Sequence, residues 1–548
     1  MSRNVRTLSG RKGLDDNLFE RLAEVPVQDG QFDTEKLHDL ADKFLVGNAN
    51  VYGAASFYDF LAPERAGKKA FVCVGSACLV AGTQGKLREE LEQHFRPDEI
   101  GEVYCLGRCH ENAAFHFDGL NYSGAAISHF SDIKNDGKAF PDEYRVGSLG
   151  AGLLTTAAPS FEKCLADLPA QLNGDREQIL EEITTSGLRG RGGAGFPLGI
   201  KLAAVRKENA EQKYIVCNAD EGDPGAFSDR YILEQRPHLL LAGMALAGFV
   251  TGATDGVVYI RAEYPEAIAI CREAVEKFNQ IFPFTRTDGE VVSFKLHVVK
   301  AQGAYICGEE TALLSSLEGL RPEVRTRPPF PVQYGLFGKP TAVNNVETLA
   351  NIPAILGMGG AAFRQIGTAK STGTKLLSLD SRFNRPGLYE VDMGTPLGTA
   401  LHELGGGFRE PVKAFHIGGP LGGLVPMEKV GDLTIDFESF AQNGFLLGHA
   451  SILCIPARFP IVEYIEHLFA FTAHESCGKC FPCRIGSTRG KELLQKAQTS
   501  QFKIDRRLFD DLLETLEKGS LCALGGGLPL PVKNAMRYFE GELRGYFK

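Results

Sequence analysis

The chain lacks an excess of basic residues. Its 548 residues include 59 lysines and arginines against 68 aspartates and glutamates, which gives a formal net charge of -9 and an isoelectric point near 5.8. Binding along a nucleic-acid backbone needs a basic surface. The composition therefore argues against a nucleic-acid partner and favours small molecules or proteins.

Long hydrophobic runs are also missing. The longest apolar stretch, Leu239 to Val250, is shorter than the ~20 residues that span a bilayer, and it is rich in glycine and alanine. We expect it to form a core helix, and we expect no direct membrane insertion. The segment from Met1 to Gly13 is basic but has no apolar stripe, so we expect a frayed terminus rather than a targeting segment.

The sequence shows no internal repeats and no low-complexity segment. A chain of this length with 43% hydrophobic residues is expected to form several domains with complete cores. Thirteen cysteines without a signal peptide indicate a reducing, cytoplasmic location, where thiols act as ligands. Five cysteines stand alone, and we expect them to be small buried residues: Cys164, Cys217, Cys271, Cys307 and Cys454.

A dense cysteine motif lies near the C-terminus. Cys477, Cys480 and Cys483 follow one another at Cys-x-x-Cys-x-x-Cys spacing, and Cys522 follows at a distance. Two-residue gaps let adjacent thiolates turn inward around one inorganic core, so this pattern predicts a 4Fe-4S cluster. A structural zinc site also takes four thiolates but usually presents two Cys-x-x-Cys pairs, so zinc is the less favoured alternative.

A second set of four cysteines follows a different spacing. Cys73 and Cys78 lie just after a strand-like run, and Cys105 and Cys109 follow the next one. Two pairs of thiolates on neighbouring loops are typical of a 2Fe-2S cluster, in which each pair holds one iron. Zinc again remains the alternative. We interpret the adjacent His110 as a capping or surface residue rather than a ligand.

Three motifs with ligand-binding potential lie in the middle of the chain. Gly190 to Phe196 contains G-x-G-x-x-G, whose glycines let backbone amides close on a phosphate or a flat ring, although a purely structural turn is an open alternative. Cys217 to Arg230 carries three acids within four residues directly after a strand, where they would face solvent or a ligand. The tandem asparagines Asn344 and Asn345 offer donors and acceptors to a heteroaromatic ring.

Together these motifs resemble one known family. Their content and order are similar to the NADH-oxidising flavoprotein subunit of respiratory complex I and to the diaphorase subunits of NAD-reducing or electron-bifurcating hydrogenases and NAD-dependent formate dehydrogenases. The N-terminal part, with its four cysteines, resembles the thioredoxin-like 2Fe-2S subunit that is a separate chain in complex I. The matching segments are 190–196, 217–230, 304–311, 344–348 and 475–484.

The resemblance implies three sets of site residues. The FMN site would comprise Gly190, Arg191, Gly192, Gly193, Lys201, Asn218, Asp220, Glu221, Tyr305, Gly308, Glu309, Asn344 and Asn345. The NAD(H) contacts would be Phe196, Asp223, Glu310, Arg327 and Phe330. The cluster ligands would be Cys477, Cys480, Cys483 and Cys522 for 4Fe-4S, and Cys73, Cys78, Cys105 and Cys109 for 2Fe-2S. Asp223 stands where many family members have glutamate.

The expected fold class is multidomain α/β. We predict a helical domain (1–65), a thioredoxin-like 2Fe-2S domain (66–155) and a Rossmann-like FMN and NADH domain (156–370). A ubiquitin-like β-rich module of the SLBB type (371–455) and a C-terminal helical bundle with the 4Fe-4S site (456–548) follow.

The resemblance implies an NADH:acceptor oxidoreductase subunit that passes electrons between NAD(H), FMN and one cluster of each kind. We expect it to belong to a soluble NAD-linked complex, formate dehydrogenase or NAD-reducing or bifurcating hydrogenase, with other iron–sulfur and catalytic subunits as partners. The alternative is the NADH-binding subunit of respiratory complex I. A zinc-stabilised scaffold without redox function is the third hypothesis.

Overall fold

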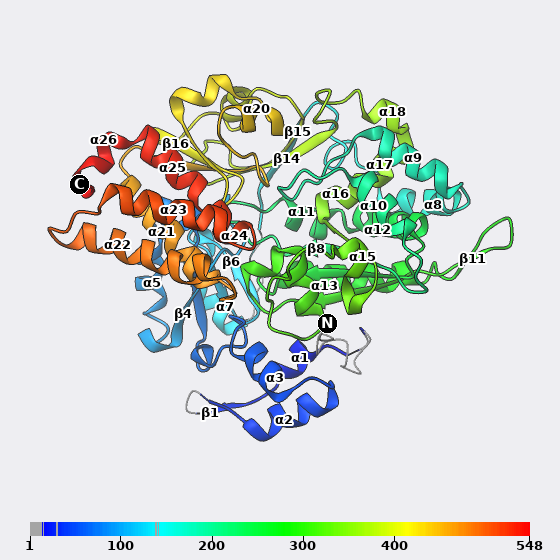
Figure 1. Ribbon diagram of the computed structural model, residues 1–548, viewed down its shortest axis with the longest axis horizontal. Coiled ribbons are helices and arrows are strands. Elements are labelled where there is room, and N and C mark those ends of the chain that lie inside the picture. Colours follow the sequence, from blue (N-terminus) through cyan, green and yellow to red (C-terminus); the bar gives the residue numbers. More distant parts are fainter. Residues whose placement is uncertain (1–13, 15, 29–30, 137–139, 141) are drawn as a thin grey trace.

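The computed structural model describes residues 14, 16–28, 31–136, 140 and 142–548. The predicted frayed terminus, Met1 to Gly13, lies outside these residues. The first described elements form a small lobe, seen in dark blue in Figure 1. They are α1 (Leu18–Leu22), β1 (Val27–Gln28), β2 (Gln31–Phe32), α2 (Thr34–Lys43) and α3 (Asn48–Ala55). The prediction of a helical start to the chain is confirmed for these residues.

A thioredoxin-like layer follows this lobe. Its four-stranded sheet has the order β4-β3-β5-β6, with β3 parallel to β4 and antiparallel to β5. The strands are β3 (Ala70–Cys73), β4 (Ile100–Val103), β5 (Phe115–Phe117) and β6 (Leu120–Tyr122). The helices are α4 (Ser76–Ala81), α5 (Gln84–Leu91), α6 (Gly124–Ile127) and α7 (Phe130–Asp136). Both cysteine pairs therefore lie at or just beyond the carboxyl ends of the parallel strands β3 and β4.

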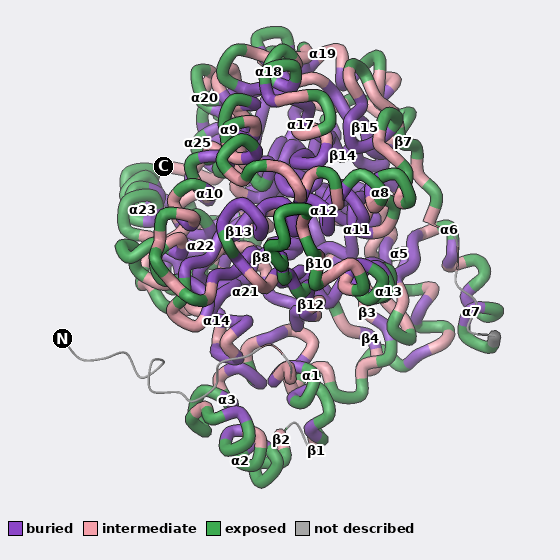
Figure 2. The backbone as a smooth tube through the Cα atoms, turned by 90° about the vertical axis from the view of Figure 1, so that its right-hand side faces the viewer, coloured by how far each residue is buried: buried purple, intermediate pink, exposed green. Residues whose placement is uncertain are grey.

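A parallel sheet of order β12-β9-β8-β13 forms the centre of the molecule. Its strands are β8 (Tyr214–Ala219), β9 (Asp255–Ile260), β12 (Lys295–Lys300) and β13 (Thr341–Asn345), and the pair β10 (Phe284–Thr285) and β11 (Val291–Val292) precedes β12. Around the sheet lie α8 (Phe161–Leu172), α9 (Arg176–Ser186), α10 (Leu198–Lys207), α11 (Ser228–Gln235), α12 (Pro237–Thr251), α13 (Pro265–Asn279), α14 (Glu310–Leu317), α15 (Pro331–Tyr334), α16 (Val346–Ala350), α17 (Ile352–Met358) and α18 (Gly360–Phe363). The predicted core helix is confirmed, because every residue of α12 after Pro237 is buried (Figure 2).

A mixed six-stranded sheet of order β17-β16-β18-β14-β15-β7 forms the β-rich module. Its strands are β7 (Arg145–Leu149), β14 (Thr374–Leu379), β15 (Gly387–Asp392), β16 (Val412–Ile417), β17 (Gly423–Pro426) and β18 (Ser451–Pro456). The short helices α19 (Leu397–Thr399) and α20 (Phe437–Gln442) belong to this module. Strand β7 pairs with β15 although it precedes the parallel sheet in the chain, so the segment after α7 crosses from one module to another.

Helices close the C-terminal end. They are α21 (Ile461–Glu475), α22 (Ser487–Thr499), α23 (Arg506–Gly519), α24 (Ala523–Gly527), α25 (Pro529–Tyr538) and α26 (Glu540–Leu543), drawn in orange and red in Figure 1. A π-helical turn over Pro482–Gly486 connects the cysteine loop to α22. The multidomain α/β fold is thus as predicted, whereas the residue limits of the five domains stay predictions.

The five single cysteines are buried, as expected. In the part of the chain that is described, every helix is too short or too polar to cross a lipid bilayer.

Candidate functional site

Polar side chains gather where β8 and β13 end. These two strands are parallel neighbours, and Asn218 of β8 stands directly opposite Asn345 of β13 in their register. The chain continues from β8 to β9 on one side and reaches β13 on the other, which makes this edge a topological switch point, the usual crevice for ligands in open α/β sheets. Here Asn344 Nδ2 and Asp220 Oδ2 are buried without a hydrogen-bond partner among the described residues.

The glycine loop covers the same edge. The N–H of Gly190 donates to the carbonyl of Phe196 (2.9 Å), which closes the loop on itself. Gly193 has a φ of 116°, and a Cβ on Gly192 would lie 3.0 Å from the Cβ of Asn345. Side chains are therefore excluded from this face of the loop, and its backbone can approach a flat ring or a phosphate closely.

Arg191 anchors the loop from within. Its side chain is fully buried, its backbone N–H donates to Thr348 Oγ1 (2.8 Å), and its guanidinium donates to the carbonyl of Thr372. Burial lowers the pKa of Arg191 to about 10. Two of its guanidinium nitrogens have no partner among the described residues, which leaves a buried cation able to serve an anionic ligand.

Three charged side chains, Lys201, Glu310 and Arg327, interact with one another near the end of β13. The ammonium of Lys201, on α10, donates to the carbonyl of Val343 (2.8 Å) and lies 3.8 Å from Glu310. Arg327 donates to the same Glu310 carboxylate (2.9 Å). The aromatic rings predicted to stack on the dinucleotide, Phe196 and Phe330, are each 50% exposed. Exposed aromatic rings and a partly exposed ion pair are the kinds of group that a nucleotide site requires.

Two predicted FMN-site carboxylates are already hydrogen-bonded to backbone N–H groups at the start of nearby helices. Glu221 accepts from the backbone N–H groups of Asp229 (3.0 Å) and Arg230 (3.1 Å) at the start of α11. Glu309 accepts from the N–H groups of Thr311 and Ala312 (both 2.9 Å) and caps α14. Both carboxylates thus accept hydrogen bonds from helix N-termini and fix the loops that carry them.

Tyr305 connects the nucleotide motif to the helix that leads to the C-terminal cysteines. Its hydroxyl donates to Asp223 Oδ1 (2.7 Å), and its backbone N–H donates to Glu475 Oε2 (2.8 Å). Nearby, the side-chain amide of Asn218 donates to the carbonyl of Gly308 (2.8 Å), which fixes that turn to the sheet. Burial raises the pKa of Asp223 and raises that of Glu475 to about 7.

The N-terminal cysteines come together in pairs. The sulfur atoms of Cys105 and Cys109 are 3.6 Å apart. A hydrogen bond with the Cys78 side chain lowers the pKa of the Cys73 thiol. All four are buried. The backbone N–H of Gly225 donates to the Cys109 sulfur (3.3 Å), so the flavin domain contributes directly to this thiolate site.

The C-terminal cysteines form a second group. The pKa of the Cys483 thiol is raised to about 11, mainly by burial and to a smaller extent by the neighbouring Cys480 and Cys477. Burial likewise raises the pKa of Cys522 to about 12, and Cys483 and Cys477 add to this shift. All four cysteines belong to one packed cluster of side chains, although they come from the segment after α21 and from the residue before α24. Such a set of thiols is able to bind iron.

Several residues around these sites could not be found from sequence motifs. His449 lies 3.4 Å from Asp229 and 3.5 Å from Glu221, and all three are buried. Burial alone lowers a histidine pKa, but the two carboxylates raise that of His449 to about 9. His110 is buried as well and bonds to Asp142 (2.9 Å), so its predicted surface or capping position is wrong.

The residues present fit the implied groups. Arg191 on the glycine loop, Asp220 just after β8 and Asn344 in β13 each have a buried polar atom without a partner among the described residues, and such atoms are available to a flavin. Two pairs of thiols and a separate set of four thiols fit a 2Fe-2S and a 4Fe-4S cluster, respectively. The assignment of individual residues to each group stays a prediction.

Family models match three parts of the chain. Residues 183–354 match the Nuo51 FMN-binding domain, and residues 463–546 match the NADH-ubiquinone oxidoreductase-F iron-sulfur binding region. Residues 6–133 match the thioredoxin-like [2Fe-2S] ferredoxin. The expected FMN, 4Fe-4S and 2Fe-2S cofactors are thereby confirmed, and NAD(H) fits the same family.

Curated relatives match about two thirds of the chain. NADP-reducing hydrogenase subunit HndC from Solidesulfovibrio fructosivorans is 42% identical over 371 residues, which are 67% of this chain and 75% of that protein. The F 2 subunit of NADH-quinone oxidoreductase in Rhizobium meliloti is 40% identical over 370 residues, 67% of this chain and 88% of that protein.

Solved structures match over nearly the full length. A chain of the NAD+-reducing [NiFe]-hydrogenase in the H2-reduced state has a TM-score of 0.83 and 29% identity, covering 94% of this chain and 91% of the other. The air-oxidized state of such an enzyme gives a TM-score of 0.84 at 28% identity, with 97% and 93% covered. The chain therefore belongs to the family of the NADH-quinone oxidoreductase F subunits and is an NADH-oxidising flavoprotein subunit with a thioredoxin-like 2Fe-2S domain in the same polypeptide.

Proposed function

We propose that the chain is the diaphorase subunit of a soluble, cytoplasmic NAD-linked complex of the NAD-reducing hydrogenase or formate dehydrogenase type. One observation carries this choice. The curated relatives, a hydrogenase subunit and a quinone-oxidoreductase subunit alike, align with 67% of the chain, whereas a single chain of the NAD+-reducing [NiFe]-hydrogenase follows 94% of it. The extra length is the N-terminal part with its own cysteine pairs. A chain of complex I would usually keep that part separate, so the fused arrangement favours the soluble enzymes.

The residues of the chain hold the reactants rather than react with them. FMN, when bound, accepts two electrons together as hydride and releases them one at a time. The glycine loop and the polar edge of β8 and β13 would bind it, with Asn218, Asn344 and Asp220 at the crevice. Arg191 would supply positive charge beneath it. The orienting backbone groups are fixed by Glu221 and Glu309 through their helix N-termini.

NAD(H) would lie on the open side of the crevice. Phe196 and Phe330 offer exposed ring faces for stacking. Glu310, Lys201 and Arg327 form a charge line at its border, where the carboxylate and the guanidinium can exchange their mutual contact for hydroxyl or phosphate groups of the dinucleotide.

Electrons would leave through the C-terminal cluster. Cys480 and Cys522 are partly exposed, whereas Cys477 and Cys483 are buried. Phe481 is 72% exposed and follows Cys480 directly; Ile485, four residues later, and Leu521, next to Cys522, are also exposed. Exposed apolar side chains beside a half-exposed cluster ligand suit the docking of another iron–sulfur subunit of the same complex.

The test is an activity measurement on anaerobically purified protein. NADH is expected to reduce an artificial electron acceptor, and removing FMN is expected to abolish this activity until FMN is added back. Activity that survives complete removal of the flavin would contradict the proposal. Identification of the co-purifying chains separates its parts: hydrogenase or formate dehydrogenase subunits support it, and membrane subunits of complex I overturn the choice of complex.

A further inference from the structure

A buried joint holds the loop of the 2Fe-2S site against the flavin domain. The loop that carries Cys105 and Cys109 also carries Arg108 and leads into His110, which are both about 4% exposed. The segment after α7 passes this loop before it enters β7, and it places Asp142 there. Asp142 belongs to none of the motifs on which the function was assigned.

The Asp142 carboxylate has three cationic or hydrogen-bonding partners from two domains. Its Oδ1 atom lies 2.8 Å from a guanidinium nitrogen of Arg108 and 2.9 Å from Nε2 of His110, both on the cysteine loop. Its Oδ2 atom lies 2.6 Å from a guanidinium nitrogen of Arg230, which lies in helix α11 of the flavin domain. One carboxylate therefore ties the cluster loop to the domain that holds the flavin.

The charge on this carboxylate is secured by its surroundings. Burial alone would raise the pKa of Asp142, but Arg230, His110 and Arg108 hold it far below its ordinary value. A carboxylate that stays ionised next to two buried guanidinium groups keeps the net local charge low. Arg108 also has Glu266 as a partner (3.3 Å), so loss of the Asp142 charge would leave both arginines with less negative charge facing them.

Aromatic rings complete the joint on its other side. The ring of His110 lies 4.7 Å from that of Tyr144 and 5.1 Å from that of Phe227, measured between centroids. Phe227 follows Gly225, whose N–H donates to the Cys109 sulfur. Asp142 is thus linked through His110 and Phe227 to the segment whose Gly225 donates to the Cys109 sulfur.

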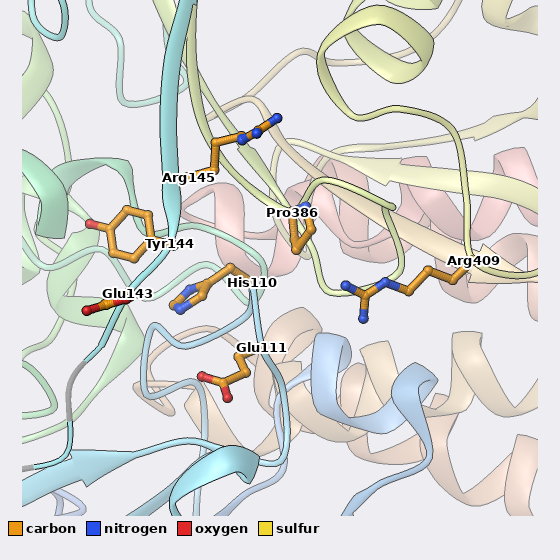
Figure 3. Close-up of a pocket in the computed structure, with 7 residues that line it drawn as sticks. All are labelled: His110, Glu111, Glu143, Tyr144, Arg145, Pro386 and Arg409. Atoms are coloured by element: carbon orange, nitrogen blue, oxygen red, sulfur yellow. The ribbon is translucent and has the colours of Figure 1, made fainter.

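A cation site is a poor description of this cluster. His110, Glu111 and Asp142 could place their ligand atoms close together, but both oxygens of Asp142 already face guanidinium groups, which would repel a metal ion. A pocket of about 310 Å³ borders the joint, and Figure 3 shows His110 and Tyr144 on one side of it and Arg409 on the other. The joint therefore lies close to solvent on this side.

We propose that Asp142 is a positioning residue for the 2Fe-2S cluster, which fixes the Cys105–Cys109 loop on the flavin domain and sets the cluster's reduction potential through its charge. This rests on the proposed assignment of Cys73, Cys78, Cys105 and Cys109 as ligands. The potential of such clusters depends on net charge, hydrogen bonds to sulfur and exposure to solvent. Removing the negative charge stabilises the reduced, more negative cluster, so the potential rises.

The experiment is a redox titration of the intact protein followed by the electron paramagnetic resonance signals of the two clusters. We expect D142N to shift the 2Fe-2S equilibrium at least tenfold toward the reduced form, which is about 59 mV for one electron. The 4Fe-4S signal is expected to keep its potential, because the predicted ligands of that cluster are not among the partners of Asp142. D142E is expected to restore the wild-type value, since it retains the charge.

A second variant distinguishes an effect of charge from an effect of misfolding. R108Q removes one positive partner of Asp142, so we expect the opposite shift, toward a more negative 2Fe-2S potential. The matched control is D255N, which removes a carboxylate that pairs with His297 (3.1 Å) away from all the cysteine ligands. It is expected to leave both potentials unchanged.

The outcomes distinguish the assignment of the 2Fe-2S ligands from the role of Asp142. Absence of a 2Fe-2S signal from the wild-type protein, with iron present at the 4Fe-4S site, would overturn the ligand assignment. A normal wild-type signal whose potential stays the same in D142N and R108Q would overturn the role of Asp142 alone. Equal shifts in D142N and D255N would also count against it, because they would reflect a general loss of charge.

Discussion

The backbone N–H of Gly225 lies 3.3 Å from the sulfur of Cys109 and donates to it. This contact joins the acidic loop after β8, which carries predicted flavin-site residues, to a predicted ligand of the N-terminal cluster. Two segments that are far apart in sequence therefore form one continuous site. The flavin edge, the nucleotide platform and the N-terminal thiols can be tested separately because different side chains serve each of them.

Replacement of Gly193 by valine is expected to abolish stable flavin binding. The φ of this residue is 116°, a conformation that a β-branched side chain strongly disfavours. The loop would have to rearrange, at a cost of about 1–3 kcal/mol, and its backbone would no longer reach the crevice. Flavin released from the purified protein by heat, measured by fluorescence per chain, checks this.

The matched control for that change is Gly357→Ala. Gly357 lies in α17, where an added Cβ meets nothing within 4 Å. We expect this variant to keep its flavin and to gain about 1 kcal/mol of stability from helix propensity. If the Gly193 variant held as much FMN as this control, the glycine loop would not be part of the flavin site.

Substitution of Arg327 by alanine is expected to weaken NADH binding. It removes a charge-assisted hydrogen bond donor from the border of the crevice, which is worth roughly 1.5–3 kcal/mol. KM for NADH should rise about 10-fold to 100-fold with kcat nearly unchanged, because the contact is made equally in the ground state and the transition state. Steady-state kinetics with an artificial acceptor measure both constants.

Arg272→Ala is the control for the kinetic test. Arg272 also pairs with a glutamate, Glu20, but both side chains are about half exposed and lie away from the crevice. Its removal should leave KM unchanged. Equal KM values in the wild type and both variants would place the nucleotide elsewhere.

The change Cys522→Ser is expected to remove the 4Fe-4S cluster while FMN is retained. Serine offers a poorer ligand to iron, and the remaining thiols cannot complete the set. Iron content should fall by about four atoms per chain, the number in such a cluster. NADH should still bleach the flavin absorption, whereas electron transfer to partner subunits should stop.

Cys164→Ala serves as the comparison, since Cys164 is buried against helix α12 and its thiol donates to the carbonyl of His238. This variant should keep all of its iron. Retention of the 4Fe-4S signal in Cys522→Ser would show that the fourth ligand comes from another residue.

The buried histidine beside the flavin loops gives a pH dependence to stability. The pKa of His449 is raised to about 9 in the folded protein, against an ordinary value near 6.5, because Asp229 and Glu221 face it. A raised pKa means that the folded state binds more protons. Its stabilising effect is therefore complete below about pH 6.5 and is lost as pH rises through about 9.

We accordingly expect His449→Gln to be less stable than the wild type by roughly 1–3 kcal/mol below about pH 6.5. The difference should shrink steadily between about pH 6.5 and about pH 9. Thermal or denaturant unfolding at a series of pH values measures it. A difference that grows with pH would mean that the histidine is neutral in the folded state.

The sequence by itself determined the cofactors and the family. Cysteine spacing is a local property, so Cys477, Cys480 and Cys483 are recognisable without knowledge of the fold. The glycine loop and the tandem asparagines are local in the same sense, because each is a run of neighbouring residues: the loop lies between α9 and α10, and the asparagines end β13. The order of strands and helices likewise predicted the α/β fold class.

Only the tertiary structure shows which polar side chains are available to a ligand and which already form hydrogen bonds within the protein. Glu221 and Glu309 belong to family motifs, yet their carboxylates cap helices, since the N–H groups of α11 and α14 happen to face them. His449 and Asp142 belong to no motif, because their roles depend on contacts with residues far away in the chain. A side chain's partners across domains follow from long-range packing, which leaves no periodic or spaced pattern in the sequence.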